Sequence, residues 1–243
     1  MEGQLNFFGE HGYLVVPDAL SPQEVRAINE AIDGDRVENQ PFWMDRKNGR
    51  HQTVHILLAQ PEFDSTMRPP GLLPLMEAIL GEDICAEEHS VMIRAANPDG
   101  PTECGWHRDA GGPAEPPYYT PRLSVVFYLT DVDETTHAFA VLPGSGQSSD
   151  LPPVDTYDLT KGVDLTGPAG TAILFNARMI HAGNVRRTPV ERRTIHIYCG
   201  LIPDRPMSNF TIFPRRLSEG RDEATQKYYS RPNPISKMLR ERF

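Results

Sequence analysis

Two side chains in the segment CGWHRDAGG, at positions 104–112, can bind a transition metal. His107 and Asp109 are separated by one residue, so on a β-strand both side chains would point to the same face. A facial iron site needs two imidazoles and one carboxylate on one side of the metal, and leaves the other side open for substrate and oxygen. The pair could therefore supply two of three ligands, although the same pair in a surface loop would have no such role.

The best candidate for the third ligand is His181. It follows the apolar segment ILFNARMI and precedes AGN, which favours a turn. A histidine at the end of a strand, beside a turn, would lie at the rim of a barrel. The alternative is a histidine that only caps a turn.

A candidate anion-binding pair follows in ERRTIHIY. Arg192 and Thr194 are two residues apart, so on one strand face a guanidinium and a hydroxyl could hold a single carboxylate. The alternative residue is Arg193. Strand alternation sends one arginine inward and the other outward, and Thr194 at the second position favours Arg192.

The elements that must position these residues are mostly strands. We expect strands within HSVMIRAANP, RLSVVFYLTDV, AFAVLPG, GTAILFNARMIHAGN and RRTIHIYCGLI, which are rich in β-branched and aromatic residues between Gly, Pro, Asn or Asp. No helical patterns alternate with them, so parallel βαβ units are disfavoured. The sequence predicts a mainly β protein, a sandwich or barrel, with flanking helices.

Helices are expected near the N-terminus. In SPQEVRAINEAI, Ser21 and Glu24 form a capping box and Pro22 occupies the first helical position. LLPLMEAILGED predicts a second helix that ends at Gly81. We expect one domain over residues 1–243, with a helical and mixed part at 1–88 packing on the barrel, core strands at 89–202 and an extension at 203–243.

Composition restricts partners and location. The net charge of −9 disfavours nucleic acid, whose phosphates need a basic face. The N-terminus lacks the basic region of a signal peptide, and no apolar run reaches membrane-spanning length. Three cysteines without CxxC spacing are typical of a reducing compartment, so we expect a cytoplasmic protein with no membrane partner.

The ordered set of motifs resembles the phytanoyl-CoA dioxygenase family of iron(II)- and 2-oxoglutarate-dependent oxygenases. The resemblance covers about residues 5–200. It rests on FFGEHGYLVVPDALSPQEV at the start, on WHRD, on AVLPGSGQ and on GTAILFNARMIHAGN. The sequence departs from the family pattern at Gly146, His137 and Thr171, where histidine, glycine and aspartate are common; none of the three is a metal-ligand position.

The resemblance implies a double-stranded β-helix, or jelly-roll, core. It also implies iron(II) held by His107, Asp109 and His181, and 2-oxoglutarate whose far carboxylate is held by Arg192. The implied reaction uses O2, releases succinate and CO2, and oxidises an unactivated C–H bond of a small molecule. Hydroxylation is the usual outcome, and desaturation, ring closure, epoxidation and endoperoxide formation are related oxidations.

Several further residues are candidates for the pocket. Arg94 could help to bind the cosubstrate, or be a solvated arginine at a strand edge. The residues that could line the substrate pocket, or else belong to the core, are His51, His55, Trp43, Tyr118 and His196.

Two alternatives remain open from the sequence. A halogenase of the same fold would carry a small residue at the carboxylate ligand position, where Asp109 stands. A metal- or ligand-binding jelly roll without oxygenase activity would form no succinate.

Overall fold

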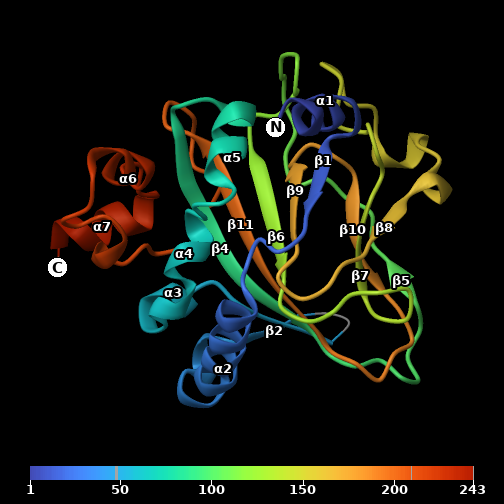
Figure 1. Cartoon of the computed structure of the whole chain (residues 1–243), viewed down its shortest axis with the longest axis horizontal. Coiled ribbons are helices and arrows are strands. Elements are labelled where there is room, and N and C mark those ends of the chain that lie inside the picture. Colours follow the sequence, from blue (N-terminus) through green and yellow to red (C-terminus); the bar gives the residue numbers. More distant parts are fainter. Residues whose placement is uncertain (47–48, 209, 243) are drawn as a thin grey trace.

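The computed structural model describes residues 1–46, 49–208 and 210–242, and two antiparallel sheets form its centre (Figure 1). The larger sheet has seven strands in the order β1-β9-β6-β11-β4-β3-β2. Its strands are β1 (Tyr13–Val16), β2 (Met44–Arg46), β3 (Arg50–Thr53), β4 (Ile84–Arg94), β6 (Leu123–Tyr128), β9 (Ala172–Asn176) and β11 (Arg192–Leu201).

The smaller sheet has four strands in the order β5-β10-β7-β8. It contains β5 (Glu103–Cys104), β7 (Ala138–Val141), β8 (Val163–Leu165) and β10 (His181–Val185). The chain passes repeatedly from one sheet to the other, so strands that neighbour each other in sequence often lie in different sheets. Two antiparallel sheets connected in this way, with few flanking helices, form the jelly-roll core that the family resemblance implies.

The central strand β6 shows how the sequence determines the two layers of the core. All six residues of LSVVFY are buried. Val125 and Phe127 belong to the apolar cluster that also contains the buried helix residues, whereas Val126 and Tyr128 belong to a second cluster that includes residues of β7 and β8. Alternate side chains of a strand point to opposite faces. A strand buried on both faces therefore needs apolar residues throughout.

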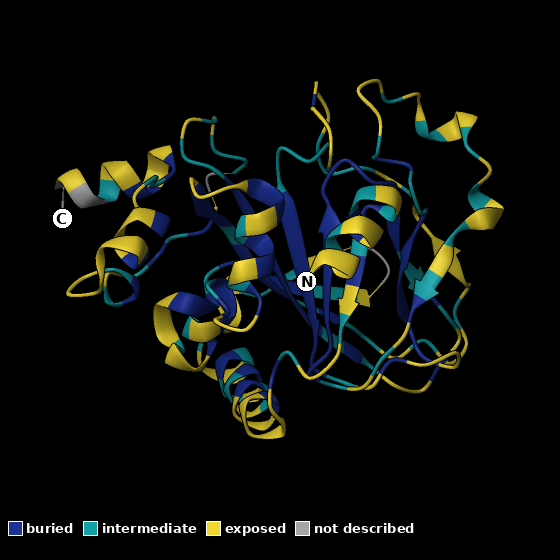
Figure 2. Cartoon of the chain, turned by 45° about the horizontal axis from the view of Figure 1, so that its top comes forward, coloured by how far each residue is buried: buried dark blue, intermediate teal, exposed yellow. Residues whose placement is uncertain are grey.

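The helices cover the outer face of the larger sheet (Figures 1 and 2). The capping box predicted at Ser21 and Glu24 is confirmed: each side chain bonds to the backbone of the other, and Pro22 begins the helix. The helix predicted before Gly81 is confirmed as well. The helices are α1 (Glu2–His11), α2 (Pro22–Glu38), α3 (Ile56–Ala59), α4 (Asp64–Met67), α5 (Leu73–Leu80), α6 (Glu223–Tyr228) and α7 (Pro234–Arg242).

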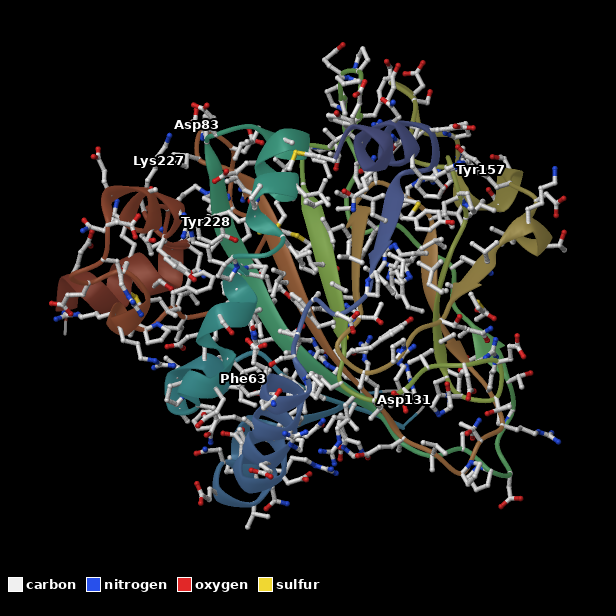
Figure 3. All side chains as sticks on the ribbon, in the orientation of Figure 1. Phe63, Asp83, Asp131, Tyr157, Lys227 and Tyr228 are labelled. Atoms are coloured by element: carbon white, nitrogen blue, oxygen red, sulfur yellow. The ribbon has the colours of Figure 1, made fainter. Side chains whose placement is uncertain are left out.

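The C-terminal segment packs against the start of β4. Figure 3 shows Lys227 of α6 beside Asp83, with Lys227 Nζ 2.8 Å from the carboxylate. The buried Tyr228 donates a hydrogen bond from its hydroxyl to the Met67 carbonyl, at 2.7 Å. This segment is thus part of the outer layer. Within the described ranges, no helix has the length and apolar character needed to span a membrane.

The structure differs from the expected division of the chain in one respect. The segment at 1–88 contributes β1, β2 and β3 to the larger sheet, and residue 88 lies inside β4. The first 88 residues therefore complete the sheet as well as covering it. Their strands are short and separated by helices, so the change in composition at residue 89 does not mark a structural boundary.

Candidate active site

The three candidate metal ligands lie together although they come from distant parts of the chain. His107 Nε2 is 3.4 Å from Asp109 Oδ1, and His181 Nε2 is 3.1 Å from Asp109 Oδ2. One potential ligand atom from each residue lies within 4.8 Å of the other two. Two imidazoles and one carboxylate in this arrangement match the donor set that non-haem iron(II) oxygenases use.

The local structure that brings them together is not the one expected. His107 forms only an isolated bridge with His181, through reciprocal backbone hydrogen bonds of 3.0 and 2.9 Å, and Asp109 lies in a bend. The Asp109 amide donates to the Ala177 carbonyl at 3.1 Å. The motif is therefore a loop held against the β9–β10 turn.

His181 begins a strand and does not end one. The expected continuous strand over ILFNARMI is divided into β9 and β10 by a turn at residues 177–180. Asn176 closes this turn: its Oδ1 accepts from the Arg178 amide at 2.9 Å. The buried Arg178 guanidinium donates to the carbonyls of Tyr119, Gly146 and Ser149. These partners are far away in sequence, which is why the apolar pattern alone did not reveal the turn.

Backbone contacts determine which imidazole nitrogens can bind a metal. His107 Nδ1 lies 2.9 Å from the Gly105 carbonyl, and His181 Nδ1 lies 3.0 Å from the Met179 carbonyl. A carbonyl only accepts, so each Nδ1 carries the hydrogen and each neutral ring keeps a lone pair on Nε2. Both Nε2 atoms face Asp109, so this tautomer is suited to metal binding.

The surroundings of Asp109 keep it ionised. Burial alone would raise its pKa, but hydrogen bonds with His107, His181 and Tyr198 hold that pKa well below the usual range. The Tyr198 hydroxyl donates to Asp109 Oδ2 at 2.5 Å. Burial and the neighbouring carboxylate raise the pKa of Tyr198 far above its ordinary value, so the hydroxyl remains a donor.

Arg108, between the two candidate ligands, has a structural role. Its guanidinium donates to the carbonyls of Arg178, Pro152 and Ser145 at 2.9, 3.0 and 3.2 Å. It also lies 5.1 Å from the ring of Tyr157, labelled in Figure 3. Through these hydrogen bonds, Arg108 connects the loop that contains His107 and Asp109 to the β9–β10 turn and to the loop after β7.

A cavity of about 620 Å³ opens next to the three ligands. Apolar and polar side chains from both sheets line it, and charged groups are prominent among them. Its lining includes Met44, Arg46, Arg50, Gln52, Val54, His55, Glu88, Met92, Arg94, Glu103, His107, Asp109, Phe139, His181, Val185, Arg192, His196, Tyr198, Met207 and Phe210. This volume suits a small molecule together with a cosubstrate.

The two neighbouring arginines of β11 point to opposite faces of the sheet. Arg192 lines the cavity, is 8% exposed, and has two buried nitrogens, Nε and Nη1, without a hydrogen-bond partner among the described residues. Arg193 faces α2, where Nη2 lies 2.7 Å from Asp33 and Nε lies 2.6 Å from Glu191. Unpaired buried donors are costly, so Arg192 is suited to bind an anion from the cavity.

The other candidates for cosubstrate binding differ from each other. Arg94 lines the cavity directly across from Arg192 on the neighbouring strand. Thr194 is buried, but it is not among the residues that line the cavity; its hydroxyl donates to the Met92 carbonyl at 3.1 Å and lies 3.1 Å from His196 Nε2. A hydroxyl has one hydrogen, so Thr194 as placed here has none left to offer a carboxylate.

Only some of the candidate pocket residues reach the cavity. His55 and His196 line it. His51 is on the opposite face of β3 from Arg50 and lies 2.5 Å from the Asp45 carboxylate. β3 ends at Thr53 and a helix follows, so His51 and His55 do not lie on one strand.

The two aromatic candidates lie elsewhere. Trp43 donates from its indole nitrogen to Asp35 on α2 at 2.8 Å, and Tyr118 packs against Phe8 with ring centroids 5.9 Å apart. Both residues pack against the helix-side core cluster.

Sequence reasoning missed several residues of the site, among them Tyr198, Arg50 and Glu88. Tyr198 continues the alternation Arg192, Thr194, His196 on β11, so the strand pattern could have indicated that it faces inward. Arg50 lies on β3 opposite Arg94, and Glu88 lies on β4. Their positions depend on strand pairing, which the sequence alone does not reveal.

Solved structures of other proteins share this fold. The structure superposes with a TM-score of 0.68 on HygX from Streptomyces hygroscopicus, solved with nickel and 2-oxoglutarate bound, at 16% sequence identity over 83% of this chain and 87% of that one. It superposes with a TM-score of 0.66 on SnoK, a non-haem, α-ketoglutarate-dependent carbocyclase of nogalamycin biosynthesis, at 19% identity over 83% and 84%. The chain thus shares its jelly-roll fold with these two proteins.

Sequence comparison identifies the family. The phytanoyl-CoA dioxygenase family model matches residues 8–194, and the chain belongs to that family. It is 26% identical to a probable α-ketoglutarate-dependent hypophosphite dioxygenase of Stutzerimonas stutzeri, over 90% of this chain and 96% of that one. It is 25% identical to the L-proline trans-4-hydroxylase of Streptomyces griseoviridis, over 77% and 81%.

These findings confirm the expected fold, family and enzyme class. The chain is a non-haem dioxygenase of the iron(II)- and 2-oxoglutarate-dependent type, which uses dioxygen as oxidant. The donor set of the three candidate ligands fits iron(II), and the unpaired nitrogens of Arg192 fit a carboxylate.

Proposed function

We propose that this dioxygenase oxidises an unactivated C–H bond of a small molecule, with hydroxylation as the outcome. Iron(II) would be held by His107, Asp109 and His181, and 2-oxoglutarate by Arg192. The observation that carries the proposal is the convergence of the three ligand atoms beside a cavity that also contains the unpaired Arg192 guanidinium. When bound, iron(II), 2-oxoglutarate and dioxygen supply the oxidising power, with succinate and CO2 as co-products.

The residues of this chain would bind, orient and enclose the reactants. The two Nδ1–carbonyl contacts orient the imidazoles, and Tyr198 orients the carboxylate. Phe139 packs against the His181 ring, with centroids 5.5 Å apart, and covers one side of the ligand group with apolar surface. Such a wall limits the access of water to the reacting C–H bond.

Halogenation is disfavoured by a specific residue. Asp109 occupies the position that a halide would need, so chlorinated product formed in the presence of chloride would contradict the proposal. A binding protein without catalysis is disfavoured by the enzyme class of the family, and it would form no succinate.

The first prediction tests the ligand assignment. His107→Ala and His181→Ala should each lose nearly all bound iron(II) and all 2-oxoglutarate-dependent succinate formation, because two remaining ligands hold the metal weakly. Bound iron is measured on protein reconstituted without oxygen, and succinate is measured by chromatography. His11→Ala, at the end of α1, is the control and should keep both. A histidine variant with full iron content would show that another side chain binds the metal.

A further inference from the structure

Four arginines lie opposite one another across four adjacent strands of the larger sheet. Arg46 on β2 pairs with Arg50 on β3, Arg50 pairs with Arg94 on β4, and Arg94 pairs with Arg192 on β11. Residues directly opposite each other in antiparallel strands share a face of the sheet. All four line the cavity beside the candidate metal ligands. We call this set the arginine row.

The arginine row is unfavourable without an anion. Like charges directly opposite each other on neighbouring strands destabilise a sheet. Burial and the nearby Arg46 lower the pKa of Arg50. Burial, Arg192 and Arg50 lower the pKa of Arg94 to about 10, against the opposing effect of Glu103. Burial and the neighbouring positive charges therefore disfavour the charged forms of Arg50 and Arg94.

The carboxylates of the cavity do not neutralise Arg50. Asp109 is engaged by the two histidines and by Tyr198. Burial raises the pKa of Glu88, and Glu103 acts on Arg94. The Nε atom of Arg50 is buried and has no hydrogen-bond partner in the part of the chain that the structure describes. Arg50 therefore lines the cavity and keeps one buried donor without a partner.

The arginine row is too long for one carboxylate. Arg192 and Arg50 are separated by the whole of β4, which places their strands about 10 Å apart. Arg192 is 8% exposed, whereas Arg46 at the other end is exposed to solvent. The inner end would hold the far carboxylate of 2-oxoglutarate, as proposed above. The outer end, with Arg50 and Arg46, can then bind a second anion.

The charge balance of the cavity agrees with a second anion. Its lining carries four arginines against three carboxylates, Glu88, Glu103 and Asp109. The two positive charges of iron(II) and the two negative charges of 2-oxoglutarate would cancel. The excess of one positive charge in the lining would therefore remain. An additional singly charged anion would bring the cavity to neutrality.

We propose that Arg50, with Arg46 beside it, binds an oxyanion group of the primary substrate. This inference rests on the proposed function, because it takes the inner end of the arginine row as the 2-oxoglutarate site. The substrate is then a small organic acid with a carboxylate or a phosphonate group. The arginines would orient it so that a C–H bond lies near the three metal ligands.

The experiment compares small acids with esters that lack the oxyanion. Protein loaded with manganese(II), which does not turn over, and with 2-oxoglutarate is titrated calorimetrically with amino acids and with alkylphosphonates, and then with the methyl ester of each amino acid and the dimethyl ester of each alkylphosphonate. We expect at least one acid to bind about tenfold or more tightly than its ester, because charged hydrogen bonds contribute roughly 1.5–3 kcal/mol each. The amino-acid and phosphonate arms distinguish the two kinds of oxyanion.

Variants then locate the site. Arg50→Gln should weaken binding of the acid about tenfold or more, and should leave the ester and 2-oxoglutarate unaffected. Arg26→Gln, which removes an exposed charge on α2, is the matched control and should change neither. The metal-free Arg50→Gln protein should melt at a higher temperature than the wild type, since a repelling charge is gone. A lower melting temperature would assign Arg50 a structural role.

Three outcomes would overturn this inference. The wild type could bind every acid no better than its ester, Arg50→Gln could leave acid binding unchanged, or Arg50→Gln could weaken 2-oxoglutarate instead of the acid. Failure of the proposed function gives a different result: the manganese-loaded wild type would then bind no 2-oxoglutarate at all.

Discussion

Tyr198 connects the strand that carries Arg192 to the candidate carboxylate ligand. Its hydroxyl donates to Asp109 Oδ2, and the residue is 7% exposed. A hydrogen bond of this kind orients a metal-binding carboxylate and limits its rotation. We therefore assign Tyr198 a positioning role.

The second prediction tests that role. Tyr198→Phe should lower iron(II) affinity about tenfold or more, because hydrogen-bonding partners of metal ligands typically contribute a factor of about 10–100. Anaerobic iron titration measures the effect. The control is Tyr128→Phe, which removes a buried hydroxyl that donates to the Leu165 carbonyl instead. Tyr128→Phe should reduce stability and leave iron affinity unchanged; equal losses of affinity in the two variants would mean that Tyr198 acts only through the fold.

At the scale of elements, the sequence predicted the structural features that depend on residues within one segment. The capping box of α2 and the alternation of β11 are encoded by neighbouring residues, and both were predicted. The loop at His107 and the turn before His181 depend on distant partners: Ala177 accepts from the Asp109 amide, and Arg178 donates to carbonyls of other loops. The candidate ligands could be chosen from the sequence, but the loop and the turn that carry them could not.

The third prediction tests the register of β11. Arg192→Leu should weaken 2-oxoglutarate binding about tenfold to a hundredfold and leave iron bound, because it removes charged hydrogen bonds to the cosubstrate and no metal ligand. Arg193→Leu should reduce stability through loss of its contacts with Asp33 and Glu191, with little change in affinity. An anaerobic titration that follows the metal-to-ligand charge-transfer band compares the two. If Arg193→Leu weakens 2-oxoglutarate binding strongly and Arg192→Leu weakens it little, the assigned register of β11 is wrong by one residue.

At the scale of the whole molecule, the site depends on segments from most of the chain. β2 and β3 bring the outer arginines from the N-terminal part, the central strands bring Arg94 and Arg192, and the smaller sheet brings His181. The C-terminal segment contacts the site from outside the sheets through Met207 and Phe210. Pairing over such separations explains why the arginine row was not visible in the sequence: Arg46 and Arg192 are far apart along the chain and meet only through two intervening strands.

The core also contains an ionisable group that links stability to pH. His89 on β4 is fully buried, where its ring packs edge-on against Phe63, labelled in Figure 3, with centroids 5.7 Å apart. Its Nε2 lies 3.1 Å from the Thr66 hydroxyl, and its Nδ1 has no partner among the described residues. Burial lowers the pKa of His89 from 6.5 to about 3, so the folded protein keeps this ring neutral.

The last prediction is that His89 makes the folded state sensitive to acid. Between pH 6.5 and about pH 3 the unfolded chain binds a proton at His89 and the folded chain does not. Stability from this residue is therefore complete above pH 6.5 and falls with decreasing pH, by at most about 1.4 kcal/mol per pH unit. Urea unfolding of metal-free protein at several pH values measures the slope.

His196, whose pKa is also lowered to about 3, adds a slope of the same sign, so the comparison is between wild type and His89→Gln. His89→Gln should be less stable at pH 7 because it leaves space in the core, yet lose less stability on acidification. Parallel curves for the two proteins would show that His89 does not gain a proton on unfolding in this range.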